Sequence, residues 1–185
     1  MSIEREPRDY EIINGQIVMM ARPSMKHVYI TGNVYAIFRN YLKGKTCRAV
    51  SEPDVFLEDK NNFVPDVAVI CDRSKIKVNG IHGAPDLVVE ILSRSTATRD
   101  KQEKKDVYEK TGVKEYWIID PDSKTITVYH LRDGIFKLDN EYFYMTPEEL
   151  AEQPADDQEA FKPEFKTSLF EDLTINVADV FDDVE

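Results

Sequence analysis

The stretch "GAPDLVVEILSRST" (residues 83–96) decides the fold, because it sets one carboxylate inside an aliphatic run. Residues 87–92 are aliphatic except for Glu90, and a short apolar run after a Gly/Pro turn signal predicts a buried strand. Removing an ionised carboxylate from water is costly unless another group compensates it. We therefore expect Glu90 to meet a partner charge or a metal ion, or to leave the core at a sheet edge.

The elements on either side of this strand predict an α/β fold in which a central mixed sheet is flanked by helices. Asn14-Gly15 is typical of a tight hairpin turn, Ser24 of a helix start, Gly44 and Gly112 of helix ends, and Asp133-Gly134 of a second hairpin. The expected elements are a hairpin at 10–20, a helix at 24–44, strands at 48–59 and 64–71, a polar helix at 95–112, a strand at 115–120 and a hairpin at 124–138. Residues 145–164 are rich in proline and acid and favour a poorly ordered connection, followed by a short terminal strand and helix.

Charge divides the chain into two parts. Residues 148–185 hold thirteen acidic residues against Lys162 and Lys166, a balance of −11 that equals the net charge of the whole chain. Residues 1–147 are neutral overall and include a basic run that is compatible with a phosphate partner. We expect one domain at 1–147 and an acidic C-terminal extension at 148–185 that docks back on it. The basic run comprises Arg94, Arg99, Lys101, Lys104, Lys105 and Lys110.

Cysteine usage and hydropathy set expectations about the environment. Cys47 and Cys71 are the two cysteines and lack CxxC spacing, so neither a disulfide scaffold nor a thiolate zinc site is indicated. A reduced, cytoplasmic setting is therefore expected. No apolar run reaches about eighteen residues, so we expect no membrane span. The charged start "MSIEREPRDY" also lacks the apolar core of a secretory signal.

A second carboxylate can meet Glu90 if two strands pair in one particular register. Asp66 opens the run "DVAVI". If strands 66–70 and 86–92 pair antiparallel with Ile70 opposite Asp86, then Asp66 lies opposite Glu90 on the same face, roughly 5 Å away. Two carboxylates this close repel each other, and a divalent cation removes the repulsion. An all-oxygen site of this kind suits Mg²⁺ or Mn²⁺.

The combined pattern resembles a known family. "VPDVAVI", then "PDLVVEILSRST", then "RDKQEKKDVYEKTGVKEYWIIDP" is similar to a bacterial family of restriction endonuclease-like proteins in the PD-(D/E)XK nuclease superfamily. The resemblance runs from about residue 10 to about 138, with a weaker echo in "LFEDLTINVADVF". It implies a restriction-endonuclease-like core, DNA as the substrate, and Mg²⁺- or Mn²⁺-dependent cleavage of phosphodiester bonds.

The resemblance assigns roles to three residues. The family's aspartate falls on Asp66 and its strand glutamate on Glu90, both as metal ligands. The lysine that the superfamily pattern places two residues after the glutamate would fall on Leu92, which cannot act. The lysine is instead displaced to Lys104 in the next helix, where Asp100, Lys104 and Tyr108 share one face. Its implied role is to orient the attacking water and offset developing negative charge.

Other residues have structural interpretations. His27 lies on the apolar face of its predicted helix and reads as a core histidine, while Tyr108 packs the polar helix on the sheet. Asp54 is a reserve metal ligand. Glu11 matches a glutamate of the family's opening hairpin but also suits the exposed side of an alternating strand.

The alternative to an endonuclease is a catalytically inactive nuclease fold used for binding or assembly, which Leu92 and the acidic end favour. If the chain is an enzyme, a homodimer is expected, because cutting both DNA strands needs two sites.

Overall fold

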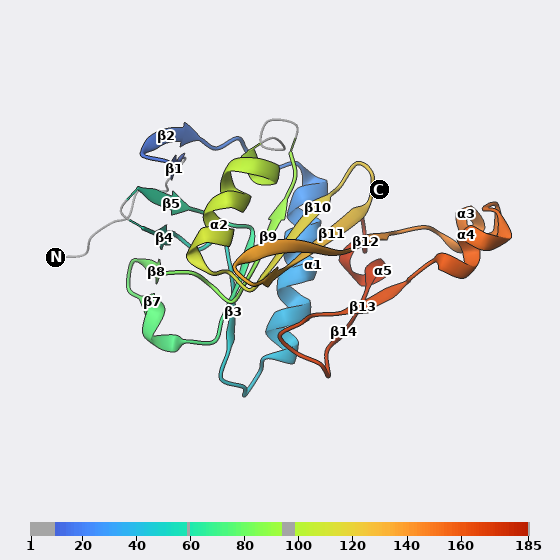
Figure 1. The fold of residues 1–185 in the computed structure, drawn as a ribbon. Coiled ribbons are helices and arrows are strands. Elements are labelled where there is room, and N and C mark those ends of the chain that lie inside the picture. The colour runs from blue at the N-terminus through green and yellow to red at the C-terminus, as the bar shows by residue number, and fades with distance from the viewer. Residues whose placement is uncertain (1–9, 59, 94–98, 185) are drawn as a thin grey trace.

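A computed structural model of the chain describes residues 10–58, 60–93 and 99–184. Its centre is a six-stranded mixed sheet with the strand order β12-β11-β10-β9-β6-β3 (Figure 1). The expected α/β architecture is confirmed. The strands of this sheet are β3 (Arg48–Ser51), β6 (Val67–Ile70), β9 (Leu87–Ile91), β10 (Glu115–Asp120), β11 (Thr125–Arg132) and β12 (Ile135–Phe143).

A second six-stranded sheet, absent from the sequence prediction, packs beside the first. Its order is β2-β1-β5-β4-β8-β7, and its strands alternate along the chain with those of the central sheet. Both residues of the predicted Asn14-Gly15 turn have positive φ, as a type I′ hairpin requires. The strands are β1 (Tyr10–Ile13), β2 (Gln16–Met19), β4 (Val55–Leu57), β5 (Asn61–Phe63), β7 (Ile76–Lys77) and β8 (Gly80–His82).

The single strand predicted at 48–59 is wrong, and this error accounts for the missing sheet. The run breaks into β3 and β4, which belong to different sheets. Glu52 between them has a left-handed backbone with φ of 47°, and Pro53 follows it. A non-glycine residue rarely adopts this conformation, so the chain turns sharply from one sheet to the other at this point.

Helices cover the two faces of the central sheet (Figure 1). Helix α1 (Met25–Tyr41) begins at the predicted Ser24 cap, whose hydroxyl accepts from the backbone N–H of His27, and it ends at Tyr41, slightly before the expected stop. Helix α2 (Lys105–Thr111) follows a π-helical turn at Arg99–Lys104 and ends at Gly112. The start of the predicted 95–112 helix lies outside the described residues. Helix α2 joins β9 to β10, which are parallel.

Alternation along the strands divides the core in two. Val67, Val69 and Val89 face α1, whereas Ala68 and Val88 face α2 and the second sheet. Successive strand residues point to opposite faces of the sheet. Because α1 covers one face, and α2 with the second sheet covers the other, the central strands are buried at every position. Polar groups at the ends of these strands therefore lie where the central sheet and the second sheet meet.

The C-terminal segment contributes to the α1 core. After two short exposed helices, the hairpin and final helix return, and Phe165, Ile175 and Val180 join that core. Because α3 carries a full capping box, the expectation of a poorly ordered connection at 145–164 is wrong. The elements are α3 (Pro147–Ala151), α4 (Ala155–Ala160), β13 (Glu164–Lys166), β14 (Thr174–Asn176) and α5 (Val177–Val180).

A buried carboxylate fastens this segment to the sheet. Glu115 is fully buried and accepts from the Trp117 indole N–H and from the backbone N–H and hydroxyl of Ser168. His130, opposite Glu115 on β11, lies between the Glu115 and Asp139 carboxylates. These carboxylates raise the pKa of His130, with Glu115 the larger cause.

Cys47 and Cys71 form a disulfide, so the expectation of reduced cysteines is not met. They flank the antiparallel pair of β3 and β6, whose register matches Arg48 with Ile70 and so places the two cysteines opposite each other. Sequence spacing gave no sign of this, because the pairing depends on the strand register. Among the described residues, none of the helices is long and apolar enough to cross a membrane.

Candidate active site

The register that was predicted for the two acidic strands is the register in the structure. Strands β6 and β9 are antiparallel, with Val67 opposite Val89 and Val69 opposite Leu87. The next pair outward is Asp66 with Glu90. Both acids therefore lie at the same end of the strand pair, and both line one cleft of about 400 Å³.

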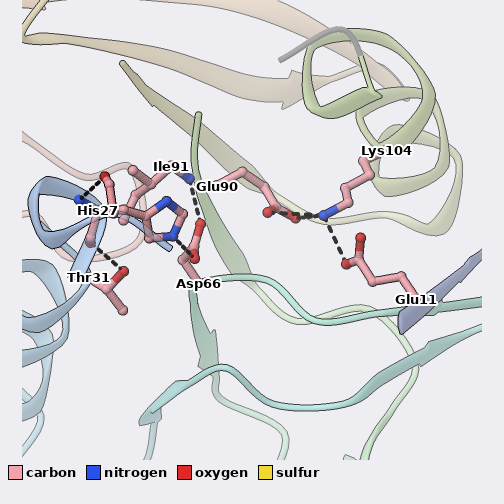
Figure 2. Close-up of polar contacts among 8 residues, drawn as sticks. Glu11, His27, Thr31, Asp66, Glu90, Ile91 and Lys104 are labelled. Carbon is pink, nitrogen blue, oxygen red and sulfur yellow. Dashed lines mark hydrogen bonds and ion pairs between the residues drawn. The ribbon is translucent and has the colours of Figure 1, made fainter. Parts of the chain in front are cut away.

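The Glu90 carboxylate is bound by the side chain of Lys104. The Nζ atom of Lys104 lies 3.2 and 3.3 Å from the two carboxylate oxygens of Glu90 and 2.9 Å from Oε1 of Glu11 on β1 (Figure 2). Glu11 also accepts from the backbone N–H of Val64 at 2.8 Å. The side chains of all three charged residues are about 95% buried. The displaced lysine thus points back at the strand glutamate, as the family resemblance and the helix spacing together led us to expect.

Tyr108 also donates a hydrogen bond to Glu90. Its hydroxyl donates to Oε1 of Glu90 at 2.7 Å, while its ring packs edge-on against Phe63. Burial and the nearby Glu90 charge hold the pKa of Tyr108 well above its ordinary value, so the phenol stays a hydrogen-bond donor. The packing role expected for Tyr108 is present, and this hydrogen bond adds to it. Lys104 and Tyr108 are four residues apart on one helical face.

Asp66 is held by a different set of contacts. One of its carboxylate oxygens accepts from the backbone N–H of Ile91 at 2.6 Å, and the other lies 2.5 Å from Nε2 of His27. Because an ionised carboxylate only accepts, Nε2 of His27 is the donor. Figure 2 shows the Asp66 carboxylate turned towards His27 on α1, whereas Glu90 extends towards Lys104. The two acids share the cleft, but their carboxylates make separate contacts.

The cleft is rich in carboxylates. Among the described residues, five acidic side chains line it, against the two cations Arg22 and Lys104. Asp54, the reserve ligand, is one of these acids and accepts a long hydrogen bond of 3.4 Å from Asn62. Within the described ranges, no three His, Cys, Asp or Glu side chains are gathered closely enough to hold a metal ion between them. The five acids are Glu11, Glu52, Asp54, Asp66 and Glu90.

Sequence reasoning missed one residue of the cleft and undervalued another. His27 was interpreted as a core histidine because it lies on the apolar face of α1, but it is at the first turn of that helix, where the core face opens onto the cleft. Glu11 was compatible with an exposed strand position, yet it is buried against Lys104. The side chain of Asp100, which was placed on the same helical face as Lys104, lies outside the described residues.

Comparisons with known proteins identify relatives of this chain. The chain is 31% identical over 134 residues to an uncharacterised protein of Synechocystis, covering 70% of each chain. It is 30% identical over 122 residues to a second uncharacterised Synechocystis protein, covering 63% of this chain and 69% of that one. A crystal structure described as a putative nuclease belonging to DUF820, from Anabaena variabilis, superposes with a TM-score of 0.65 at 24% identity, covering 93% of this chain and 89% of that one. This likeness shows the shared fold.

The model of the family Uma2, described as "Putative restriction endonuclease", matches residues 1–158, a range that includes every residue of the acidic cleft and both sheets. This membership supports a nuclease function. The chain therefore belongs to the Uma2 family of restriction endonuclease-like proteins.

Proposed function

We propose that the chain is a metal-dependent endonuclease that hydrolyses phosphodiester bonds in DNA at the acidic cleft. The observation that carries this proposal is the buried contact between Lys104 and Glu90 in the cleft that Asp66 also lines. The Lys104 ammonium beside Glu90 and Glu11, in a cleft that Asp66 also lines, matches the three functions that the reaction needs. These are cation binding, orientation of the attacking water, and compensation of negative charge on the phosphate.

The polar residues around Lys104 and Asp66 each serve one of these functions. Lys104 orients the water and offsets the charge that develops on the phosphodiester, while Glu11 and Glu90 fix the position of its ammonium group. Tyr108 fixes one oxygen of Glu90 by its hydrogen bond. His27 and the Ile91 N–H hold Asp66 in one orientation. Leu92, at the position that usually carries the lysine, is buried in the core near α2 and takes no part.

The chemistry of the donor set fits Mg²⁺ or Mn²⁺. Mg²⁺ prefers oxygen ligands, keeps several waters, and is usually bound by one or two carboxylates together with substrate phosphates. A dense three-residue cluster is therefore not required. Asp66 and Glu90 would hold the ion, and Asp54 would be its reserve ligand. When bound, the ion would lower the pKa of a water and stabilise charge on the phosphate.

Supercoiled plasmid is the most direct substrate for a test. With Mg²⁺ or Mn²⁺ the wild-type protein should nick or linearise the plasmid, and Lys104→Met should slow cleavage by at least about a hundredfold, as loss of one charge-stabilising donor does in other enzymes. The matched control is Lys110→Met, because Lys110 lies on the same helix but pairs with Glu58 at the surface. Equal loss of activity in both variants would count against a role of Lys104 in the chemistry.

A second candidate is a binding or assembly module without catalysis. Leu92 occupies the usual lysine position, and the ammonium of Lys104 is already paired with both Glu90 and Glu11. Calorimetric titration with Mn²⁺ separates the two candidates. Binding that is lost in Glu90→Gln supports the endonuclease, whereas no heat of binding at millimolar metal supports the inactive module. Light scattering would test the expected homodimer.

A further inference from the structure

A second cavity opens off the acidic cleft along α1. This α1 groove has a volume of about 320 Å³ and shares Pro23, His27 and Glu52 with the cleft. The two cavities therefore meet beside the His27–Asp66 pair, and a chain-like molecule with one group at the acids can continue into the groove. The groove extends along α1 from His27 to Tyr35, about 12 Å at the helical rise of about 1.5 Å per residue.

The wall formed by α1 is a stripe of groove-facing side chains at helical spacing. Val28, Thr31, Gly32 and Tyr35 form this wall, and Tyr35 is partly buried against the α1 core. The hydroxyl of Thr31 donates to the carbonyl of His27 (Figure 2). The stripe is therefore mostly apolar, and it ends in the aromatic ring of Tyr35. Ser51 and Glu52 lie on the opposite wall.

Gly32 leaves the groove open at its middle. Glycine is the poorest helix former after proline, yet it lies in the centre of a 17-residue helix. Apart from its chain neighbours and the nearby backbone of its own helix, no described atom lies within 4 Å of the place where its Cβ would be, so packing within the described chain does not explain the glycine. A larger side chain here would fill the groove without disturbing the fold.

We propose that the α1 groove binds one unpaired nucleotide next to the phosphodiester in the cleft. The proposal rests on the proposed function, because the phosphate at the acids is what places the next nucleotide beside His27. A cavity of this size is at the low end of sites for single small groups, so it accepts one base that has left its stack and excludes a stacked base pair. The base stacks on Tyr35, as bases do on aromatic side chains of single-strand-binding proteins.

The groove also has a polar wall that can read the base edge. Glu52 has its backbone fixed in the left-handed conformation by a hydrogen bond from its N–H to the carbonyl of Asp66. A carboxylate only accepts hydrogen bonds, and it pairs with the exocyclic amino group of cytosine. Thymine has no such group. The groove therefore favours cytosine over thymine.

The test is fluorescence anisotropy of labelled oligonucleotides with Ca²⁺ in place of Mg²⁺, so that a cation can hold the phosphate at the acids while binding is measured apart from cleavage. The wild-type protein should bind a short single strand of deoxycytidine more tightly than a duplex of the same length or a strand of deoxythymidine. Gly32→Leu and Tyr35→Ala should weaken this binding by roughly ten- to a hundredfold, the usual effect of losing one stacked base. Tyr29→Ala is the matched control, because Tyr29 is an exposed tyrosine of α1 that does not line the groove.

Gly32→Leu is the decisive variant, since it improves helix propensity and should keep or raise the melting temperature. A folded Gly32→Leu protein with wild-type affinity, or a wild-type protein that prefers duplex, would overturn the assignment of the groove. Equal affinity for the two single strands would overturn the contact with Glu52. Plasmid cleavage, measured separately, distinguishes the two proposals. Binding that depends on the groove, without plasmid cleavage, would refute only the endonuclease proposal. Plasmid cleavage together with unchanged binding by Gly32→Leu would refute only the groove proposal.

Discussion

Replacement of Lys104 by methionine should expose how strongly the site is coupled to the stability of the protein. The variant keeps most of the side-chain volume but removes the ammonium from between Glu11 and Glu90, whose side chains are 6% and 4% exposed. Removing one partner of a buried ion pair costs about 3–5 kcal/mol. Because the Tyr108 hydroxyl and the Val64 N–H still bind the two carboxylates, we expect the lower end, about 3 kcal/mol. For a chain of this size that free energy lowers the melting temperature by roughly 6–12 °C.

Thermal unfolding without divalent metal measures this effect, and two comparisons identify its cause. Lys110→Met removes a surface pair of the same helix and should change the free energy of unfolding by less than about 1 kcal/mol. Adding Mn²⁺ should stabilise Lys104→Met more than the wild type, because the ion replaces the missing positive charge and binds the folded state. If Lys104→Met melts with the wild type, the ammonium does not compensate the buried acids, and the electrostatic account of the site is refuted.

Three further predictions concern groups around the site and the sheet. Tyr108→Phe keeps the ring and loses the hydrogen bond to Glu90, so it should lower the free energy of unfolding by about 1.5–3 kcal/mol in a urea titration; an unchanged midpoint would contradict the bond. Glu115 raises the pKa of His130 in the folded protein. The stabilisation that protonated His130 contributes is therefore complete below its unfolded pKa of about 6.5 and is lost as the pH rises through its folded pKa. The wild-type urea midpoint should therefore fall across that interval, and His130→Gln should flatten the profile. Cys71→Ser opens a loop with a sequence separation of 24 and should cost about 3 kcal/mol relative to the oxidised protein, while mass mapping without reductant should recover the linked peptides.

The sequence was sufficient to predict the centre of the fold and the main contact of the site. Alternation in "DVAVI" and "LVVEI" fixed which residues share a face, so one assumed pair determined the whole register of Asp66 and Glu90. The family resemblance selected Lys104, and helical spacing placed it with Tyr108 on one face that can meet the strand. These inferences succeeded because each depends on a local periodicity.

What the sequence could not predict depends on contacts between distant segments. A left-handed Glu52 is not visible in a run of strand-forming residues, so the second sheet was missed. The proximity of His27 to Asp66 results from how α1 crosses the end of β6, and neither residue type nor spacing encodes that crossing. The pairing of Cys47 with Cys71 follows from the β3–β6 register in the same way.

The alternation of the two sheets along the chain limits how the protein can be divided. Strands of one sheet are repeatedly interrupted by strands of the other between β1 and β9, so no single cut after β3 and before β8 yields a fragment that contains a whole sheet. Glu11 belongs to one layer, and Asp66 and Glu90 to the other. Transplantation of β6 and β9 alone into another scaffold would leave Glu11 behind. Limited proteolysis should accordingly abolish both layers in one cooperative step.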